Sequence, residues 1–306
     1  VFFANIAIDS VKGTVPASLF AIFQMTFAII TPALIVGAFA ERMRFSAMLL
    51  FSTLWLILVY SPVCHWVWGG GWLGAMGLQD FAGGTVVHIT AAVAALVAAL
   101  VIGPRRGFGT VAMPPHNLTL TVAGAGMLWV GWFGFNAGSA VAANGSAAMA
   151  MLVTHLSASA GALAWMTMEW LRHGKPSMLG TVTGMVAGLG TITPASGSVG
   201  PAAAVLIGLT AGVVCYFATM YLKNKLRVDD SLDVFPVHGV GGMLGTLLVG
   251  VFASQQLGIF SGNGFSSGIS SMGGQLLVQA TGVVSTLVYT AVVTFILLKL
   301  VGALVG

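Results

Sequence analysis

Long runs of apolar residues, separated by short polar segments, dominate the chain from residue 17 to residue 301. A helix needs ~20 predominantly apolar residues to cross the hydrocarbon core of a bilayer. Runs of this length, without the alternation of β-barrel strands, predict membrane-spanning helices. Nine are expected, at about 17–40, 45–66, 81–103, 118–141, 147–170, 179–195, 200–222, 234–254 and 276–301. The sixth is the weakest, because it is short and rich in Gly and Thr.

Composition agrees with a polytopic, all-α membrane helix bundle. Charged residues make up 6% of the chain, whereas soluble domains carry roughly 25%. The 42 glycines suit closely packed transmembrane helices. The two cysteines, Cys64 and Cys215, both lie in apolar segments, so neither a disulfide framework nor a metal-binding spacing is expected.

Basic residues fall almost entirely on alternate loops. Ten of the eleven are Arg42, Arg44, Arg105, Arg106, Arg172, Lys175, Lys223, Lys225, Arg227 and Lys299, and Lys12 lies on the opposite side. Because positive residues favour the cytoplasmic side, the N-terminal end is expected outside and the C-terminal end inside. This placement at span ends explains the net charge of +4 without nucleic acid as a partner.

Two ionisable pairs recur at the same spacing inside the predicted membrane. Asp80 precedes His88 by eight residues, and Asp230 precedes His238 by eight residues. Their two spans run in opposite directions, which is typical of an inverted repeat. Eight helical residues rise ~12 Å, so each His would lie near the middle of a ~30 Å core. Small residues follow each His and would permit a close crossing.

Simpler structural roles remain open for these residues. A membrane His can merely hydrogen-bond a neighbouring helix, and this is the expectation for His155, which has no mirrored partner. Asp80 could cap the following helix, place negative charge near an outer cation site, or do both. A local pair with Arg172 is expected for Glu169. Two His with distant Asp residues are poor evidence for an enzyme or a metal site.

Aromatic residues gather towards the expected outer side. Trp66, Trp68 and Trp72 end the second span, where an interfacial aromatic belt is the simpler reading. The three glycines after Trp68 would let an indole face a vestibule, and an indole face attracts cations. The stretch GWFGFNAGSA carries Trp132, Phe133, Phe135 and Ser139, whereas Phe23 and Phe27 have a spacing that is usually a packing stripe.

Several stretches together resemble the bacterial ammonium transporters of the ammonium transporter/methylammonium permease/Rhesus family. They are FAGGTVVHI, GWFGFNAGSA, VWGGG, AERMRFS, LRVDD and VHGVGG. The resemblance implies an eleven-helix fold with an inverted five-helix repeat, a homotrimer and one pore per subunit. The nine spans would be helices three to eleven, so the first two helices and most of the C-terminal tail would be absent.

The same resemblance implies a single transporter domain over 1–306, with an outer loop at 1–16. The remainder of the first repeat would be 17–103, the second repeat 118–254, and the last helix 276–301. It also implies functional residues: an outer recruitment site at Phe27, Trp68 and Ser139, and a gate of Phe27 and Phe135. His88, His238 and Trp132 would line the pore, while Asp80 and Asp230 would support it.

Ammonium transport is therefore the function that the sequence predicts, with methylammonium as an analogue. Ammonium would be recruited outside and deprotonated, and ammonia would pass along the His pair. The alternative is an ammonium sensor coupled to a cytoplasmic PII-type regulator. No enzyme activity, cofactor, metal or nucleic acid is expected. The expected location is the inner (plasma) membrane of the cell, with several spans.

Overall fold

A computed structural model describes residues 6–305, so residues 1–5 of the expected outer loop lie outside the described part. It is almost entirely helical, with one short hairpin of β1 (Val11–Lys12) and β2 (Val15–Pro16). The α-helices are α1 (Ala17–Val36), α2 (Phe45–Trp55), α3 (Ser61–Trp68), α4 (Trp72–Ala75), α5 (Thr90–Ile102), α6 (Leu118–Gly138), α7 (Gly145–His173), α8 (Met178–Ile192), α9 (Pro201–Met220), α10 (Gly241–Phe252) and α11 (Met272–Val305). Helical turns of other pitch are η1 (Leu56–Tyr60), η2 (Gly84–Ile89), η3 (Tyr221–Lys225), η4 (Phe235–Val240) and η5 (Gly258–Phe260).

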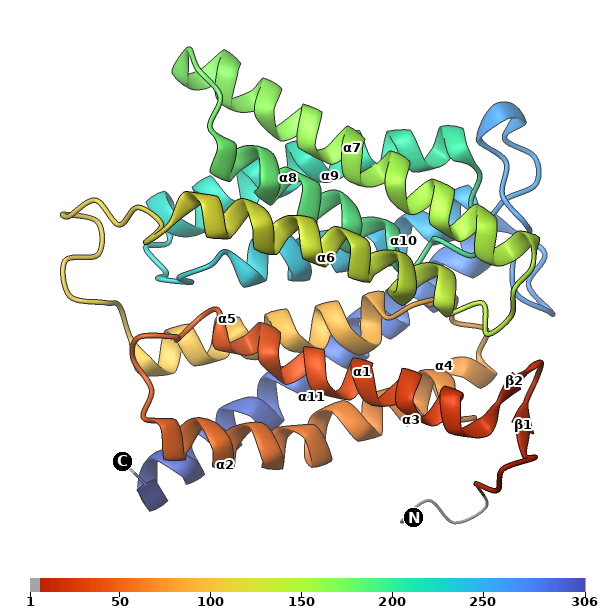
Figure 1. Cartoon of the computed structure of the whole chain (residues 1–306), viewed down its shortest axis with the longest axis horizontal. Coiled ribbons are helices and arrows are strands. Elements are labelled where there is room, and N and C mark those ends of the chain that lie inside the picture. Colours follow the sequence, from red (N-terminus) through yellow and green to blue (C-terminus); the bar gives the residue numbers. More distant parts are fainter. Residues whose placement is uncertain (1–5, 306) are drawn as a thin grey trace.

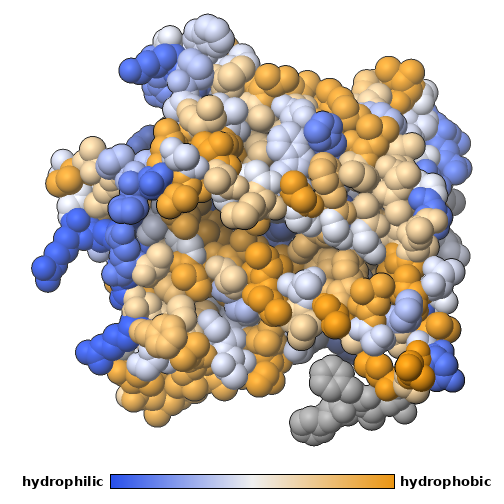
Figure 2. Space-filling view, viewed as in Figure 1, coloured by the Kyte–Doolittle hydropathy of each residue, from blue (hydrophilic) through white to orange (hydrophobic). Residues whose placement is uncertain are grey.

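The helices confirm the all-α membrane fold. Within residues 6–305, eight helical segments are long and apolar enough to span a bilayer. Figure 2 shows a broad apolar band between more hydrophilic ends. The sixth expected span, 179–195, is the shorter helix α8, with 15 residues. Most of α8 is buried against other helices, and a helix that is shielded from lipid need not match the membrane thickness.

The helices lie roughly side by side in two groups. In Figure 1, α1, α2, α3, α5 and α11 form one group, and α6–α10 form the other. The C-terminus lies at the end of the molecule that carries the α1–α2 and α5–α6 loops, and the N-terminal hairpin lies at the opposite end. These are the alternate loops on which the basic residues fall, as the charge pattern predicted.

Close backbone approach holds α7, α8 and α9 together. A Cβ added at Gly188 of α8 or at Gly208 of α9 would overlap the carbonyl oxygen of Ser157 on α7. The Ser157 hydroxyl also donates a hydrogen bond of 2.9 Å to the Gly188 carbonyl. Small residues at such positions let membrane helices approach closely. This packing fixes α8, whose C-terminal cap residue Thr193 accepts a hydrogen bond from Trp132, a residue that lines the cavity described below.

A buried ionic anchor joins the helix ends on the side of the C-terminus. The guanidinium of Arg105 donates hydrogen bonds to both carboxylate oxygens of Asp229, at 2.8 and 2.9 Å. The backbone N–H of Arg105 donates to the same carboxylate at 2.7 Å. Arg42 donates to the carbonyl oxygens of Ala38, Gly103 and Asp229. The anchor therefore ties the ends of α1 and α5 to the segment that precedes η4.

Burial raises the pKa of the Asp229 carboxyl, but the hydrogen bonds and charge of Arg105 outweigh it and leave the pKa below its usual value. The stabilisation from this carboxylate is therefore present at neutral pH and is lost as pH falls through that lowered pKa. We expect Arg105→Ala to lower the thermal unfolding midpoint in detergent, because the Asp229 carboxylate would keep only the more distant Arg42 guanidinium, at 3.5 Å, as an ionic partner.

A double variant tests the cause of that loss. Arg105→Ala combined with Asp229→Asn should regain part of the midpoint, because the amide carries no unpaired charge. Exposed Arg106 provides the matched control, and Arg106→Ala should leave the midpoint near that of the unchanged protein. Equal losses for Arg105→Ala and Arg106→Ala would contradict a specific role of the anchor.

Candidate functional site: a histidine pair in an apolar cavity

Asp80 begins the helical segment that carries His88. Its carboxylate is buried and accepts hydrogen bonds from the N–H groups of Gly83, Gly84, Thr85 and Val86, at 2.7 to 3.2 Å. The backbone reaches this arrangement through Gly83, whose φ of +109° disfavours residues with a Cβ. Asp80 therefore satisfies backbone donors that a helix start otherwise leaves free, which is the capping role expected for it.

Asp230 occupies the equivalent place before His238. Its Oδ2 accepts a hydrogen bond of 2.6 Å from the N–H of Phe235, the first residue of η4. Asp233, three residues after Asp230, has a φ of +59°, and so matches Gly83, three residues after Asp80. The second copy is capped less fully, because the Asp230 Oδ1 is buried without a hydrogen-bond partner among residues 6–305.

His88 and His238 meet in the interior. Their Nδ1 atoms lie 3.2 Å apart, and their ring planes differ by 21°. Both imidazoles are buried, with His88 1% and His238 7% exposed. Gly242 permits this approach, because a Cβ there would lie 2.9 Å from the His88 Cβ. The small residues that follow His238 do allow the close crossing that the sequence predicted.

The contact between the two Nδ1 atoms constrains the protons. A hydrogen bond requires one Nδ1 to carry the proton and the other to accept it. In a neutral imidazole only one ring nitrogen is protonated. The donor ring therefore has a basic Nε2, whereas the acceptor ring has an Nε2–H. A neutral pair thus offers one acceptor and one donor.

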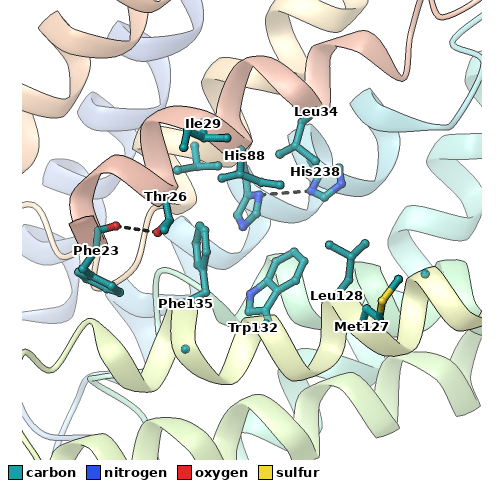
Figure 3. A pocket seen from close by; sticks show the side chains of 15 residues that line it. Phe23, Thr26, Ile29, Leu34, His88, Met127, Leu128, Trp132, Phe135 and His238 are labelled. Atoms are coloured by element: carbon teal, nitrogen blue, oxygen red, sulfur yellow. Dashed lines mark hydrogen bonds between the residues drawn. The ribbon is translucent and has the colours of Figure 1, made fainter. Parts of the chain in front are cut away.

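Both histidines line a cavity of about 700 Å³. Apart from the imidazoles, its walls are mainly apolar residues of α1 and α6, including Ile29, Leu34 and Leu128. Figure 3 shows Trp132 and Phe135 projecting from α6 towards the His88 and His238 side chains. The Trp132 ring is nearly parallel to both imidazoles, at 16° to His88 and 5° to His238.

Aromatic rings adjoin the His pair on the side nearer the N-terminal hairpin. Phe27 packs against Phe135 with ring centroids 4.3 Å apart, and against Trp68 at 5.5 Å. Phe23 is also in contact with Phe27, at 4.9 Å, so the i and i+4 spacing here reflects packing. The Trp68 indole donates a hydrogen bond of 2.8 Å to the Asp80 carbonyl. The structure therefore brings Phe27, Trp68 and Phe135 together.

Ser139 lies at the C-terminal cap of α6, four residues after Phe135. Its hydroxyl donates a hydrogen bond of 2.7 Å to the Phe135 carbonyl. The proton is thereby committed to the backbone, and the oxygen lone pairs stay available as acceptors. The Ser139 oxygen can therefore accept a hydrogen bond from a donor outside the helix.

An amide cluster that sequence reasoning missed holds the chain just before Asp80. The Gln279 amide accepts a hydrogen bond from the Gln79 N–H at 2.9 Å and donates one to the Gln79 carbonyl at 2.8 Å. Gln275 donates to the Gly77 carbonyl at 3.0 Å. Both amides on α11 are fully buried. The sequence signal for this cluster was the pair Gln275 and Gln279, two polar residues four positions apart in an apolar span.

Gln279→Ala should destabilise the fold. It should also loosen the contact between Phe27 and Trp68, because Trp68 is held by the Asp80 carbonyl that follows Gln79. It leaves the Gln79 N–H and carbonyl unpaired, and each such loss costs about 1–3 kcal/mol. We expect a lower thermal unfolding midpoint in detergent. Gln255→Ala is the matched control, because Gln255 makes an exposed hydrogen bond. Equal thermal midpoints for the Gln279 and Gln255 variants would contradict a structural role of the Gln79–Gln279 hydrogen bonds.

Two local expectations are wrong. His155 makes no interhelical hydrogen bond among the described residues; it is exposed and packs on Trp129 and Phe133, at centroid distances of 5.1 and 6.1 Å. Glu169 does not pair with Arg172 but accepts hydrogen bonds from the Ser177 N–H and hydroxyl. Ser177 caps α8, so the carboxylate supports the turn between α7 and α8 instead.

A multi-pass helix bundle in which two buried histidines and a tryptophan line an apolar cavity is the architecture of a membrane transport protein. Residues 1–306 match the Ammonium Transporter Family, so the chain belongs to that family. It is 49% identical to an ammonium transporter of Bacillus subtilis over 290 residues, which are 95% of this chain and 70% of the relative. The family and this relative identify a transporter and not an enzyme.

Solved structures agree with the family assignment. The chain matches Saccharomyces cerevisiae Mep2 with a TM-score of 0.84 and 39% identity, over 93% of this chain and 66% of the Mep2 chain. It also matches a "Sensor Amt Protein" with a TM-score of 0.86 and 31% identity, over 92% and 70% of the two chains. The chain thus spans about two thirds of the length of these solved relatives.

Proposed function

We propose that this chain forms the conducting part of an ammonium transporter. The observation that carries the proposal is the hydrogen-bonded pair of His88 and His238 in an apolar cavity, next to the packed rings of Phe27 and Phe135. Ammonium transport also agrees with the family and with the relative from Bacillus subtilis. Methylammonium is the expected analogue, because it keeps three N–H donors.

Recruitment is assigned to Phe27, Trp68 and Ser139. Aromatic faces attract a cation through their quadrupole, and the Ser139 oxygen has lone pairs for an N–H donor. Potassium has a similar size and the same charge as ammonium but has no hydrogen-bond donor. The acceptor therefore favours ammonium where charge alone could not.

Deprotonation at the gate of Phe27 and Phe135 would provide a second filter, because potassium cannot lose a proton. A full charge in an apolar passage costs several kcal/mol, and neutral ammonia avoids most of that cost. The Nε2 acceptor and Nε2–H donor of the His pair match the donor and acceptor of ammonia. The released proton would follow a separate relay, in which an imidazole can take part.

Uptake of labelled methylammonium by cells that lack their own ammonium transport tests the proposal. The protein at its natural length should give saturable uptake that ammonium inhibits and a large excess of potassium does not. Uptake no greater than in cells with an empty vector would contradict ammonium transport. Inhibition by potassium as strong as by ammonium would contradict the selectivity mechanism.

The membrane context is part of the same proposal. The chain belongs in the inner (plasma) membrane, with the N-terminal end outside and the basic loops and C-terminal end in the cytoplasm. The equivalent Asp–His segments support an inverted repeat of 17–103 and 118–254, with 276–301 as a last helix. A homotrimer with one pore per subunit is expected, and crosslinking in membranes would detect it.

A sensor is the second candidate, favoured by the match to a "Sensor Amt Protein". The basic loops could form a surface for a cytoplasmic PII-type regulator, although the distribution of positive residues across membranes already accounts for them. Pull-down with a PII protein, with and without ATP and 2-oxoglutarate, tests that partner. Absence of binding in every state would remove the PII proposal without affecting transport.

A further inference from the structure

The indole of Trp132 has a defined hydrogen-bond partner outside the His pair. Its Nε1–H donates a hydrogen bond of 2.8 Å to the hydroxyl oxygen of Thr193, and both side chains are buried. Trp132 lies on α6, whereas Thr193 is the C-terminal cap of α8. The contact therefore joins a ring of the cavity wall on α6 to α8, another helix of the same group.

The Thr193 hydroxyl is itself held in one orientation. It donates its proton to the Leu189 carbonyl at 2.8 Å, so its oxygen lone pairs face the indole N–H. Thr193 is fully buried. An indole N–H is a donor and cannot accept, so a change of ring angle would leave it unpaired in an apolar site. This fixes the rotation of the Trp132 ring as well as its position.

The same short segment also locates the start of η2. The Pro194 carbonyl accepts a hydrogen bond of 3.1 Å from the Phe81 N–H. A Cβ at Gly84 would lie 2.6 Å from the Pro194 ring, so the first residue of η2 rests against Pro194. Residues 193–194 therefore place both the Trp132 ring and the segment that carries His88.

Ring alignment in the cavity follows from this common support. Trp132 stacks on His88 with centroids 5.4 Å apart, and its plane also lies 5° from that of His238. In Figure 3 the indole projects from α6 into the same space as the two imidazoles. Rotation of the indole would change the width of the passage and admit water beside the imidazole nitrogens.

We propose that Thr193 is a positioning residue for ammonia conduction, and that it acts by setting the plane of the Trp132 indole opposite His88 and His238. This inference rests on the proposed transport function. Thr193 touches the Trp132 ring and not the His pair, so its effect on transport passes through that ring. It would control passage of ammonia and not recruitment of ammonium at the outer rings.

Transport kinetics test this role with three variants. Thr193→Val keeps the side-chain shape but removes the acceptor, and should lower the maximal methylammonium uptake rate about tenfold, as expected from one lost buried hydrogen bond. The half-saturation concentration should stay within about twofold, because an interaction outside the recruitment site changes the rate and not the binding. Thr193→Ser restores the hydroxyl and should recover most of the rate.

Thr191→Val is the matched control. Thr191 is equally buried and lies two residues away, but its hydroxyl has no hydrogen-bond partner in the structure. Rates are divided by the amount of protein in the membrane. Equal rates for Thr193→Val and the unchanged protein would overturn the proposal. Equal losses in the Thr191 and Thr193 valine variants would overturn it too, since they would reflect general packing.

An experimental structure of Thr193→Val separates this inference from the transport proposal. We expect the Trp132 indole to rotate away from the His88 plane, or a water molecule to bind its Nε1–H. An indole that keeps its angle and stays dry would overturn the positioning role even if transport occurs. If the unchanged protein carries no methylammonium, the transport proposal fails, whereas the structural result still reports on the support of Trp132.

Discussion

Replacing both His88 and His238 with alanine is expected to abolish selective methylammonium uptake. The substitution removes both the acceptor and the donor that a neutral pair offers in the cavity. An apolar space of that kind gives ammonia no partner for its own hydrogen bonds. Uptake by the double variant should fall to the level of cells that carry an empty vector. The measurement is labelled methylammonium uptake, corrected for protein in the membrane.

His155→Ala is the matched control for the double variant. It also removes an imidazole from a membrane helix, but His155 is exposed on α7 and lies outside the paired site. Uptake should be retained in this control. Each single variant, His88→Ala and His238→Ala, should reduce uptake without loss of the protein from the membrane. Unchanged ammonium-selective uptake by the double variant, with potassium still excluded, would overturn the His mechanism.

Asp80→Ala should also abolish uptake, in this case by destabilising the folded protein. Four backbone N–H groups donate to this one carboxylate, and each donor left unpaired in a buried site costs about 1–3 kcal/mol. The start of η2 would lose its support, and the His88 ring would lose its position. We expect little folded protein in the membrane, a markedly lower thermal midpoint in detergent and no uptake.

Asp80→Asn separates the hydrogen bonds that the Asp80 side chain accepts from its negative charge. The amide keeps one oxygen acceptor, but its NH₂ group would face backbone N–H donors, so its thermal midpoint should lie between those of the alanine variant and the unchanged protein. Asp9 lies exposed just before the N-terminal hairpin, and Asp9→Ala should change neither stability nor uptake. A folded Asp80→Ala variant with a normal midpoint would contradict the capping role.

Features that depend on local spacing were predictable from the sequence. The equal Asp-to-His intervals predicted that His88 and His238 would meet, and the structure places their nitrogens 3.2 Å apart. The span boundaries were also close, because apolar runs of this length have few other structures in a membrane. Capping by Asp80 followed from its place directly before an apolar run.

Contacts between distant segments that share no repeated sequence pattern were not predictable in this way. The anchor of Arg105 with Asp229 joins positions 124 residues apart, and nothing in either loop indicates the partner. Gln79 and Gln279, which are joined by hydrogen bonds, lie 200 residues apart in the sequence. The π-helical turns η2 and η4 also escaped prediction, because one widened turn hardly alters an apolar pattern. Both of these turns carry a cavity histidine.

The helical turns η2 and η4, which carry His88 and His238, are capped unequally. Asp80 restrains four N–H groups, whereas the Asp230 carboxylate receives the Phe235 N–H and leaves its other oxygen unpaired. Local opening is easier where fewer hydrogen bonds must break. The amides after Asp230 should therefore exchange with deuterium faster than those after Asp80. We therefore expect the segment that carries His88 to be held more rigidly than the segment that carries His238.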